Sequence, residues 1–127
     1  MIEKRIYYHD TDAGGVVYYA NYLKFLEEDR TEFLEQKGIS IKEMHQNHFF
    51  YAVRQCSISY KSPARYGDVL RCESTLKKMT AAQLIFDQKI YEKETRRLIL
   101  EAEVTLVSLD KDFKPTPIPE RIKALLV

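Results

Sequence analysis

The sequence contains no long apolar segment and few cysteines. Its uninterrupted apolar runs last only a few residues, whereas a membrane-spanning helix needs about 20. Residues 1–5 lead directly into a strand pattern and lack the apolar centre of a signal peptide. The two cysteines, Cys56 and Cys72, are too few for a disulfide framework. We therefore expect a cytoplasmic protein with free thiols and no membrane span.

The chain also lacks an excess of charge of either sign. It has 20 Lys and Arg residues against 19 Asp and Glu, and the net charge of +1 gives no basis for nucleic-acid binding. No glycine-rich phosphate loop is present, which excludes P-loop nucleotide hydrolysis. Tryptophan is absent too, but nine Tyr and six Phe supply bulk for a core. The length of 127 residues predicts one domain, 1–127.

The first half of the chain has the pattern of a strand followed by two helices. Residues 3–9 are rich in Ile and Tyr and predict a strand. Residues 17–37 contain no Pro or Gly and predict a helix of five or more turns, which Gly38 ends. Residues 40–47 predict a short helix with Ser40 as its N-cap.

From residue 49 onward, apolar residues alternate with polar ones. The alternation predicts long strands near 49–61, 69–79, 82–93 and 96–109. Five residues at even-numbered positions of the first of these strands are predicted to share one face of the sheet: Phe50, Ala52, Cys56, Ile58 and Tyr60. Cys56 and Cys72 both have the inward parity, so we expect both in the core. A short helix at 120–126 follows a proline-rich segment. The sum predicts an α+β fold, in which one long helix packs on a five-stranded antiparallel sheet.

Two aspartates stand in the glycine-containing loop before the long helix. Asp12 in this loop would lie beside helix-start N–H groups, which stabilise negative charge. An EF-hand would need an oxygen ligand at position 14 and Glu at position 21, where the chain has Gly14 and Asn21, so we predict no metal site. We expect Asp10 to support the turn. For Asp12, capping and catalysis both stay open on this basis.

Two separated motifs resemble one enzyme family. Residues 7–22 read YYHDTDAGGVVYYANY and are followed by Arg30-Thr31-Glu32. Residues 60–70 read YKSPARYGDVL. Both segments resemble the hotdog-fold acyl-CoA thioesterases of the YbgC and 4-hydroxybenzoyl-CoA thioesterase family, and the resemblance covers most of the chain. It implies a hotdog fold and hydrolysis of an acyl-CoA thioester to a carboxylic acid and CoA.

The resemblance also implies roles for residues of the first motif. Asp12 matches the catalytic carboxylate, either the nucleophile on the thioester carbonyl or the general base for water. The Tyr19 N–H matches the group that polarises the thioester oxygen. Many YbgC-type sequences have His at this position, and Tyr19 retains the backbone donor but not an imidazole. Tyr8 matches a tyrosine beside the catalytic carboxylate, and Asn21 is expected to fix the loop and helix start. No cofactor is implied.

Substrate contacts and partners follow from the same resemblance. Lys61 and Arg65 flank the second motif and are our candidates for binding the CoA phosphates. The acyl group is expected in an apolar slot beside the helix, lined by Tyr22, Phe25 and Tyr60. The thiol carrier is CoA or, alternatively, an acyl-carrier protein. The family pairs subunits so that their sheets join, which predicts a homodimer or homotetramer with the active site at the interface.

Two other functions are compatible with the fold. A hotdog dehydratase or hydratase would carry an Asp/His pair in a different motif, which this sequence lacks. A non-catalytic acyl-CoA or acyl-carrier-protein binding module is the alternative from another class, because Tyr19 replaces an imidazole. His9 is expected on the first strand, before the loop and outside the catalytic group.

Overall fold

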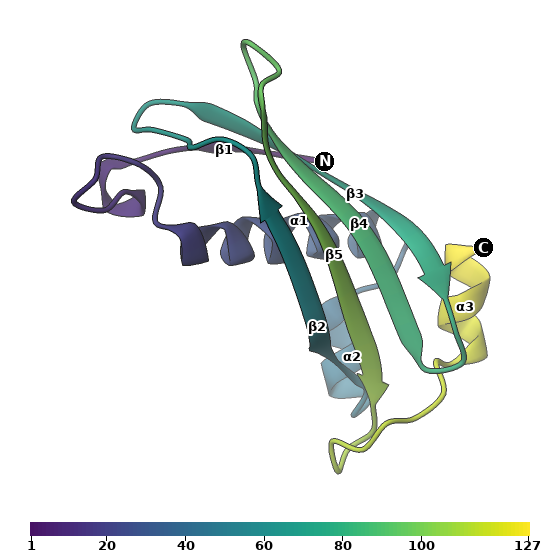
Figure 1. Cartoon of the computed structure of the whole chain (residues 1–127). Coiled ribbons are helices and arrows are strands. Elements are labelled where there is room, and N and C mark those ends of the chain that lie inside the picture. Colours follow the sequence, from purple (N-terminus) through teal and green to yellow (C-terminus); the bar gives the residue numbers. More distant parts are fainter.

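Five antiparallel strands form one sheet in the computed structural model, which describes all residues 1–127 (Figure 1). The sheet order is β1-β3-β4-β5-β2, so β1 and β2 are its edges. The strands are β1 (Ile2–Arg5), β2 (Phe50–Tyr60), β3 (Val69–Met79), β4 (Gln83–Glu92) and β5 (Leu98–Leu109). The helices are α1 (Tyr22–Gln36), α2 (Ile41–Gln46) and α3 (Glu120–Leu126). The predicted α+β fold is confirmed, including the long helix and the five-stranded antiparallel sheet.

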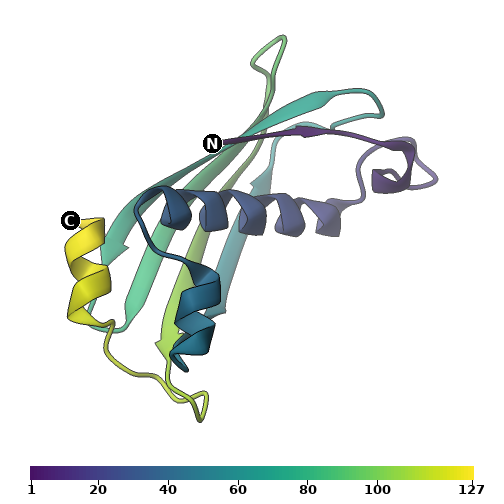
Figure 2. The ribbon, with the colours of Figure 1, turned by 180° about the vertical axis from the view of Figure 1, so that it is seen from behind.

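Helix α1 lies across one face of the sheet, and α2 and α3 lie toward the end of the sheet away from the loop that precedes α1 (Figure 2). The core forms between α1 and the central strands. Leu26 and Leu34 on α1 and Phe86 on β4 are at most 2% exposed. Burying each such side chain contributes about 1.5–3 kcal/mol. None of the helices is both long and apolar enough to cross a membrane.

Helix α1 begins later than the sequence pattern predicts. The prediction started it at residue 17, but the α-helix begins at Tyr22 after a 3₁₀ turn at Tyr19–Asn21. The Val17 N–H donates to the Ala64 carbonyl at 2.8 Å, so a distant loop holds this stretch outside the helix. The predicted end is confirmed, since Gly38 adopts a φ of 87° directly after α1.

The first strand is shorter than predicted. It ends at Arg5, and Tyr8–Asp10 form a 3₁₀ turn rather than continuing the strand. The Asp10 carboxylate accepts a hydrogen bond from the Tyr7 N–H at 2.9 Å, which closes this turn. His9 therefore lies in a turn and not on the strand, and its side chain is 81% exposed.

The other elements agree closely with the sequence pattern. The four long strands lie within two residues of their predicted ends, and α3 matches the predicted 120–126. Ser40 caps α2, because its side chain accepts a hydrogen bond from the Glu43 N–H at 3.2 Å.

A β-bulge changes the faces of β2. Val53 pairs with Leu106 and Gln55 pairs with Thr105, so Arg54 has no partner in β5. Because of this extra residue, side chains before the bulge lie on the opposite face of the sheet from the one that strict alternation predicts. The predicted common face is therefore wrong for residues 50 and 52, and Tyr51 and Val53 instead share the face that carries the later residues of β2, at 56, 58 and 60.

The two cysteines lie in different environments. Cys72 on β3 is fully buried, as predicted. Cys56 is exposed, and its prediction as a core residue is wrong. The reason is topological, because β2 is an edge strand and the inward face of an edge strand is covered on one side only.

Candidate active site

A short hairpin precedes the helical region and positions Asp12. Thr11 and Val17 form an antiparallel bridge. Between them the Asp12 N–H donates to the Val16 carbonyl at 2.9 Å, and the Gly15 N–H donates to the Asp12 carbonyl at 3.0 Å. Gly15 has a φ of 77°, a conformation that glycine adopts without strain. The hairpin backbone thus fixes the position from which the Asp12 side chain extends.

The Asp12 carboxylate is exposed and only half engaged. Its Oδ1 accepts a hydrogen bond from the Gly14 N–H at 2.8 Å, and no group of the chain donates to Oδ2. A Cβ atom at position 14 would lie 3.1 Å from Oδ1, so Gly14 permits this close approach. One oxygen is therefore held by the loop, while the other is free to act on a bound molecule.

Asp10 supports the loop from within. Its side chain is buried, and its Oδ1 accepts from the Asn21 amide at 3.3 Å. The Asp10 carbonyl accepts from the same amide at 3.3 Å and from the Tyr18 N–H at 3.1 Å. These bonds tie the turn before the hairpin to the start of the helical region. The predicted supporting roles of Asp10 and Asn21 are confirmed.

Tyr19 begins the 3₁₀ turn that leads into α1. Its N–H donates to no acceptor in the chain, as is common at a helix start. Its carbonyl accepts from the Tyr60 hydroxyl at 3.2 Å, and the two rings lie edge to face with centroids 6.4 Å apart. The side chain is 63% exposed. A free backbone donor thus lies next to a pair of accessible aromatic rings.

Tyr60 and Tyr22 are in contact but differ in accessibility. Their ring centroids lie 5.9 Å apart. Tyr60 is 47% exposed, whereas Tyr22 is only 3% exposed. The Tyr22 hydroxyl accepts a hydrogen bond from the Ala64 N–H at 3.2 Å, and burial raises the pKa of Tyr22. Tyr22 therefore holds the 62–68 loop in place and offers little surface to a ligand.

The two cations proposed for phosphate binding lie on the loop after β2. Arg65 forms a bridge with Val16, which places this loop against the Asp12 hairpin. The Lys61 N–H donates to the Ile99 carbonyl at 2.7 Å. Both side chains are exposed, and neither forms an ion pair within the chain. They are free to bind an anion.

Tyr8 lies on the outer side of the same loop region. Its side chain is 82% exposed, and its ring meets the Tyr66 ring edge-on with centroids 6.5 Å apart. The Tyr8 carbonyl accepts from the Thr11 hydroxyl at 2.7 Å, so its backbone anchors the start of the hairpin. The fold thereby gathers the loop residues of both sequence motifs at one end of the sheet.

Comparison with known proteins identifies the family. Residues 7–126 match the thioesterase-like superfamily. The chain belongs to this superfamily. It is 39% identical over 121 residues to the acyl-CoA thioester hydrolase YbgC of Escherichia coli, covering 94% of this chain and 90% of that protein. YbgC of Haemophilus influenzae is 33% identical over 94% of this chain and 88% of that protein.

A solved thioesterase structure has the same fold as this chain. The 1,4-dihydroxy-2-naphthoyl-CoA thioesterase of Synechocystis superposes with a TM-score of 0.90 at 25% identity, covering 98% of this chain and 93% of that one. The predicted hotdog fold and the prediction of a thioesterase are confirmed. The alternative of a non-catalytic binding module receives no support from these relatives.

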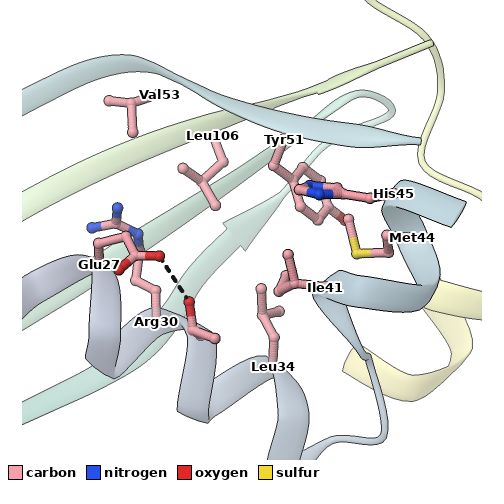
Figure 3. Close-up of a pocket in the computed structure, with 10 residues that line it drawn as sticks. Glu27, Arg30, Leu34, Ile41, Met44, His45, Tyr51, Val53 and Leu106 are labelled. Carbon is pink, nitrogen blue, oxygen red and sulfur yellow. Dashed lines mark hydrogen bonds between the residues drawn. The ribbon is translucent and has the colours of Figure 1, made fainter. Parts of the chain in front are cut away.

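The thioesterase also contains a cavity of about 220 Å³ between α1, α2 and the β2–β5 edge (Figure 3). Its apolar wall consists of Leu34, Ile41, Met44, Tyr51, Val53 and Leu106. Glu27, Arg30, Thr31 and His45 complete the lining. None of the residues predicted for the acyl slot lines this cavity, and Phe25, like Tyr22, is almost fully buried.

Sequence reasoning missed two groups of this site. Tyr51 was assigned to the wrong face, because the bulge at Arg54 is visible only in the pairing of β2 with β5. Arg97 was not among the site residues predicted from the sequence, yet its guanidinium donates to the Ser62 hydroxyl at 2.8 Å and to the Pro63 carbonyl at 2.6 Å. Arg97 therefore secures the loop that carries the second motif.

Proposed function

We propose that this thioesterase hydrolyses an acyl-CoA thioester to a free carboxylic acid and CoA. The observation that carries the proposal is the Asp12 loop, which presents a carboxylate oxygen without a partner close in sequence to the unpaired N–H of Tyr19. The similarity to YbgC, named an acyl-CoA thioester hydrolase, supports CoA as the thiol carrier.

Asp12 acts on the thioester in one of two ways. As a general base it removes a proton from water, whose oxygen attacks the carbonyl carbon. As a nucleophile it attacks the carbonyl carbon itself, and water then cleaves the resulting mixed anhydride. In both cases the carbon–sulfur bond breaks, the thiolate of CoA leaves and takes up a proton, and the acyl group departs as a carboxylic acid.

Tyr19 acts through its backbone. Its free N–H donates to the thioester oxygen, which becomes negatively charged when the tetrahedral intermediate forms. Loss of one such donor typically costs about 2.7–4 kcal/mol of transition-state stabilisation. The helix start adds positive potential at the same point. The Tyr19 phenol is not required for proton transfer, and we assign its exposed ring, with those of Tyr8 and Tyr60, to contacts with the substrate.

Lys61 and Arg65 bind the phosphates of CoA in this proposal. Their side chains are exposed and unpaired, and Arg65 lies directly beside the Asp12 hairpin. Phosphate groups form charge-assisted hydrogen bonds with both residue types. The acyl group lies at the opposite side of the thioester, against the apolar surfaces beside α1.

The active enzyme is a homodimer or homotetramer in this proposal. Strand β2 is an 11-residue sheet edge whose outer backbone groups are unpaired, and Val53 on it is 52% exposed. A long edge of this kind is prone to pair with another strand. We propose that two copies pair along β2. The two unpaired thiols support the predicted cytoplasmic location.

Release of free thiol from acyl-CoA tests the function. The purified protein is assayed against short, long and aromatic acyl-CoA esters, and against the same acyl groups on an acyl-carrier protein. We expect turnover of at least one acyl-CoA. Absence of thiol release from every acyl-CoA would refute the proposal, and turnover of the carrier-protein esters alone would move the specificity to that thiol.

A further inference from the structure

Arg97 lies directly before β5 and connects the two arms of the 62–68 loop. Its Nη1 donates to the Ser62 hydroxyl at 2.8 Å and to the Pro63 carbonyl at 2.6 Å. Its Nη2 lies 3.8 Å from Asp68 Oδ2, at the other end of the same loop. No backbone N–H donates to the Pro63 carbonyl, so Arg97 is its donor within the chain. We call these contacts the Arg97 clamp. One planar guanidinium thus holds both arms of the loop.

The middle of the 62–68 loop holds the Asp12 hairpin. Ala64 is fully buried, and its carbonyl accepts a hydrogen bond from the Val17 N–H at 2.8 Å. Arg65, the next residue of the loop, forms the antiparallel bridge with Val16. The part of the loop that contacts the hairpin therefore begins directly after the carbonyl that Arg97 holds.

The position of the Asp12 carboxylate depends on this contact. The Asp12 N–H donates to the Val16 carbonyl at 2.9 Å, beside the bridge to the loop. The carboxylate accepts one hydrogen bond, from the Gly14 N–H at 2.8 Å, which belongs to the same hairpin. Any shift of the hairpin therefore carries the carboxylate with it. A misplacement of about 1 Å between reacting groups can lower a rate about 100-fold.

Arg96 has the same charge as Arg97 but no part in the clamp. The residue directly precedes Arg97 and is exposed. Its guanidinium forms no hydrogen bond or ion pair with the 62–68 loop, in contrast to that of Arg97. The two neighbouring arginines therefore separate the effect of a positive charge at this end of the sheet from the effect of the clamp.

We propose that Arg97 is a positioning residue for the hydrolysis, because its clamp on the 62–68 loop sets where the Asp12 hairpin stands against a bound thioester. This inference rests on the proposed role of Asp12 and adds a residue that acts through the loop. The guanidinium contacts neither the thioester nor the CoA phosphates in this account.

Thiol release by Arg97→Ala, compared with Arg96→Ala, tests the inference. For Arg97→Ala we expect kcat to fall by about 10- to 100-fold and KM to change by less than about threefold, because the reacting groups are misplaced while substrate contacts remain. Arg96→Ala should keep the wild-type kcat. Arg97→Lys should have an intermediate kcat, since one ammonium can donate to the Pro63 carbonyl but does not reproduce the planar fork.

A thioester of pantetheine distinguishes positioning from phosphate binding. This substrate lacks the nucleotide phosphates, so Arg97→Ala should lower its kcat by the same factor as it lowers kcat for the acyl-CoA. A raised KM for the acyl-CoA alone, with unchanged kcat, would mean that Arg97 binds CoA phosphates and would overturn the inference. If Arg97→Ala does not fold, Arg97→Lys takes its place in both assays, with a smaller expected loss of kcat.

Amide hydrogen exchange measures the hold on the hairpin independently of activity. We expect the Val17 and Asp12 amides to exchange at least about tenfold faster in Arg97→Ala than in Arg96→Ala, because the loop that holds them is released. The Phe86 amide, in the middle of β4, should exchange at the same rate in both variants. Equal acceleration of all three amides would show a general loss of stability and would contradict a specific clamp.

The two measurements separate this inference from the function on which it rests. Thiol release by the wild type with equal kcat in Arg97→Ala and Arg96→Ala refutes the positioning role and leaves the hydrolysis standing. Absence of thiol release by the wild type from every acyl-CoA refutes the proposed function. In that case hydrogen exchange decides the clamp alone, with faster exchange of the Val17 and Asp12 amides in Arg97→Ala as the supporting result and equal exchange as the contrary one.

Discussion

Asp10 and Asp12 stand two residues apart, yet the fold gives them opposite environments. Asp10 is 6% exposed and both its oxygens accept hydrogen bonds, from Tyr7 and Asn21. Asp12 is exposed, and one of its oxygens has no partner. The same residue type therefore serves as a structural brace in one position and as a free acid group in the other.

Asp10→Ala should destabilise the protein. The substitution leaves the Tyr7 N–H and the Asn21 amide, both in partly buried hydrogen bonds, without their carboxylate acceptor, so we expect the free energy of unfolding to fall by about 1–3 kcal/mol. Urea denaturation measures this change. Asp112→Ala alters an exposed loop position and should stay within about 0.5 kcal/mol of wild type. Equal stability of both variants would contradict the bracing role.

Removing both loop cations should weaken CoA binding without slowing the chemistry. For Lys61→Ala with Arg65→Ala we expect KM to rise about tenfold with little change in kcat, because charge-assisted phosphate contacts are lost. Lys111→Ala is the surface-charge control. For a thioester of pantetheine, which lacks the nucleotide phosphates, we expect the wild type and the double variant to have the same KM. If KM for the pantetheine thioester rose by the same factor as KM for the acyl-CoA, the two cations would not be binding the CoA phosphates.

At the scale of elements, the sequence predicted the helix boundaries that are set by residues close in sequence. Gly38 ends α1 through its positive φ, and Ser40 caps α2 through its own side chain, so both positions could be read from the sequence. The start of α1 could not, because the Val17 N–H bonds to Ala64 in a loop 47 residues farther along the chain. The bulge at Arg54 likewise exists only in the register with β5.

The candidate site likewise has one part that could be predicted from the sequence and one part that could not. The Asp12 loop was recognisable because its residues are contiguous, and its hydrogen bonds are short in range. The cavity around Tyr51 was not predictable, since it requires the bulged register of β2 and side chains from α1, α2 and β5. Motif resemblance identified the thioesterase family, whereas the cavity depends on long-range pairing.

The turn between β4 and β5 predicts a pH dependence of stability. The Glu92 carboxylate accepts from the Thr95 N–H and hydroxyl, both at 2.7 Å, which lowers the pKa of Glu92 below its ordinary value. The folded protein thus binds this proton less readily than the unfolded chain. The contribution is complete at neutral pH and disappears as pH falls through the lowered pKa.

Glu92→Gln should therefore flatten the acidic side of the stability profile. We expect the variant to be less stable than the wild type at pH 7 and the difference to shrink as the solution is acidified below pH 4. Urea denaturation between pH 3 and pH 7 measures the two curves. A difference that stays constant over this range would show that the carboxylate charge does not matter to the turn.

At the scale of the whole molecule, the fold is a single sheet with α1 on one face and an unpaired edge at β2 (Figure 1). The opposite face carries ion pairs such as Lys77–Glu103 at 2.7 Å and Lys89–Glu101 at 3.9 Å and can face water. The open edge, in contrast, exposes Tyr60 and Val53, and Tyr60 contacts Tyr19 of the proposed active site. This difference between edge and face supports the proposed pairing of two copies along β2.

Sedimentation equilibrium tests this arrangement. The chain mass is 15.0 kDa, so a homodimer or homotetramer gives two or four times that value. We expect one of these multiples at the protein concentrations used for the activity assays. A single species at the monomer mass under those conditions, with full thiol release, would show that the active site is complete within one chain.

The central claim is that the Asp12 carboxylate performs the hydrolysis, and thiol release by Asp12→Asn measures it most directly. We expect kcat to fall by at least about 100-fold, the contribution of a positioned acid–base group, with wild-type stability. Asp87→Asn, an exposed change on β4, should retain wild-type kcat. Undiminished thiol release from folded Asp12→Asn would contradict the account.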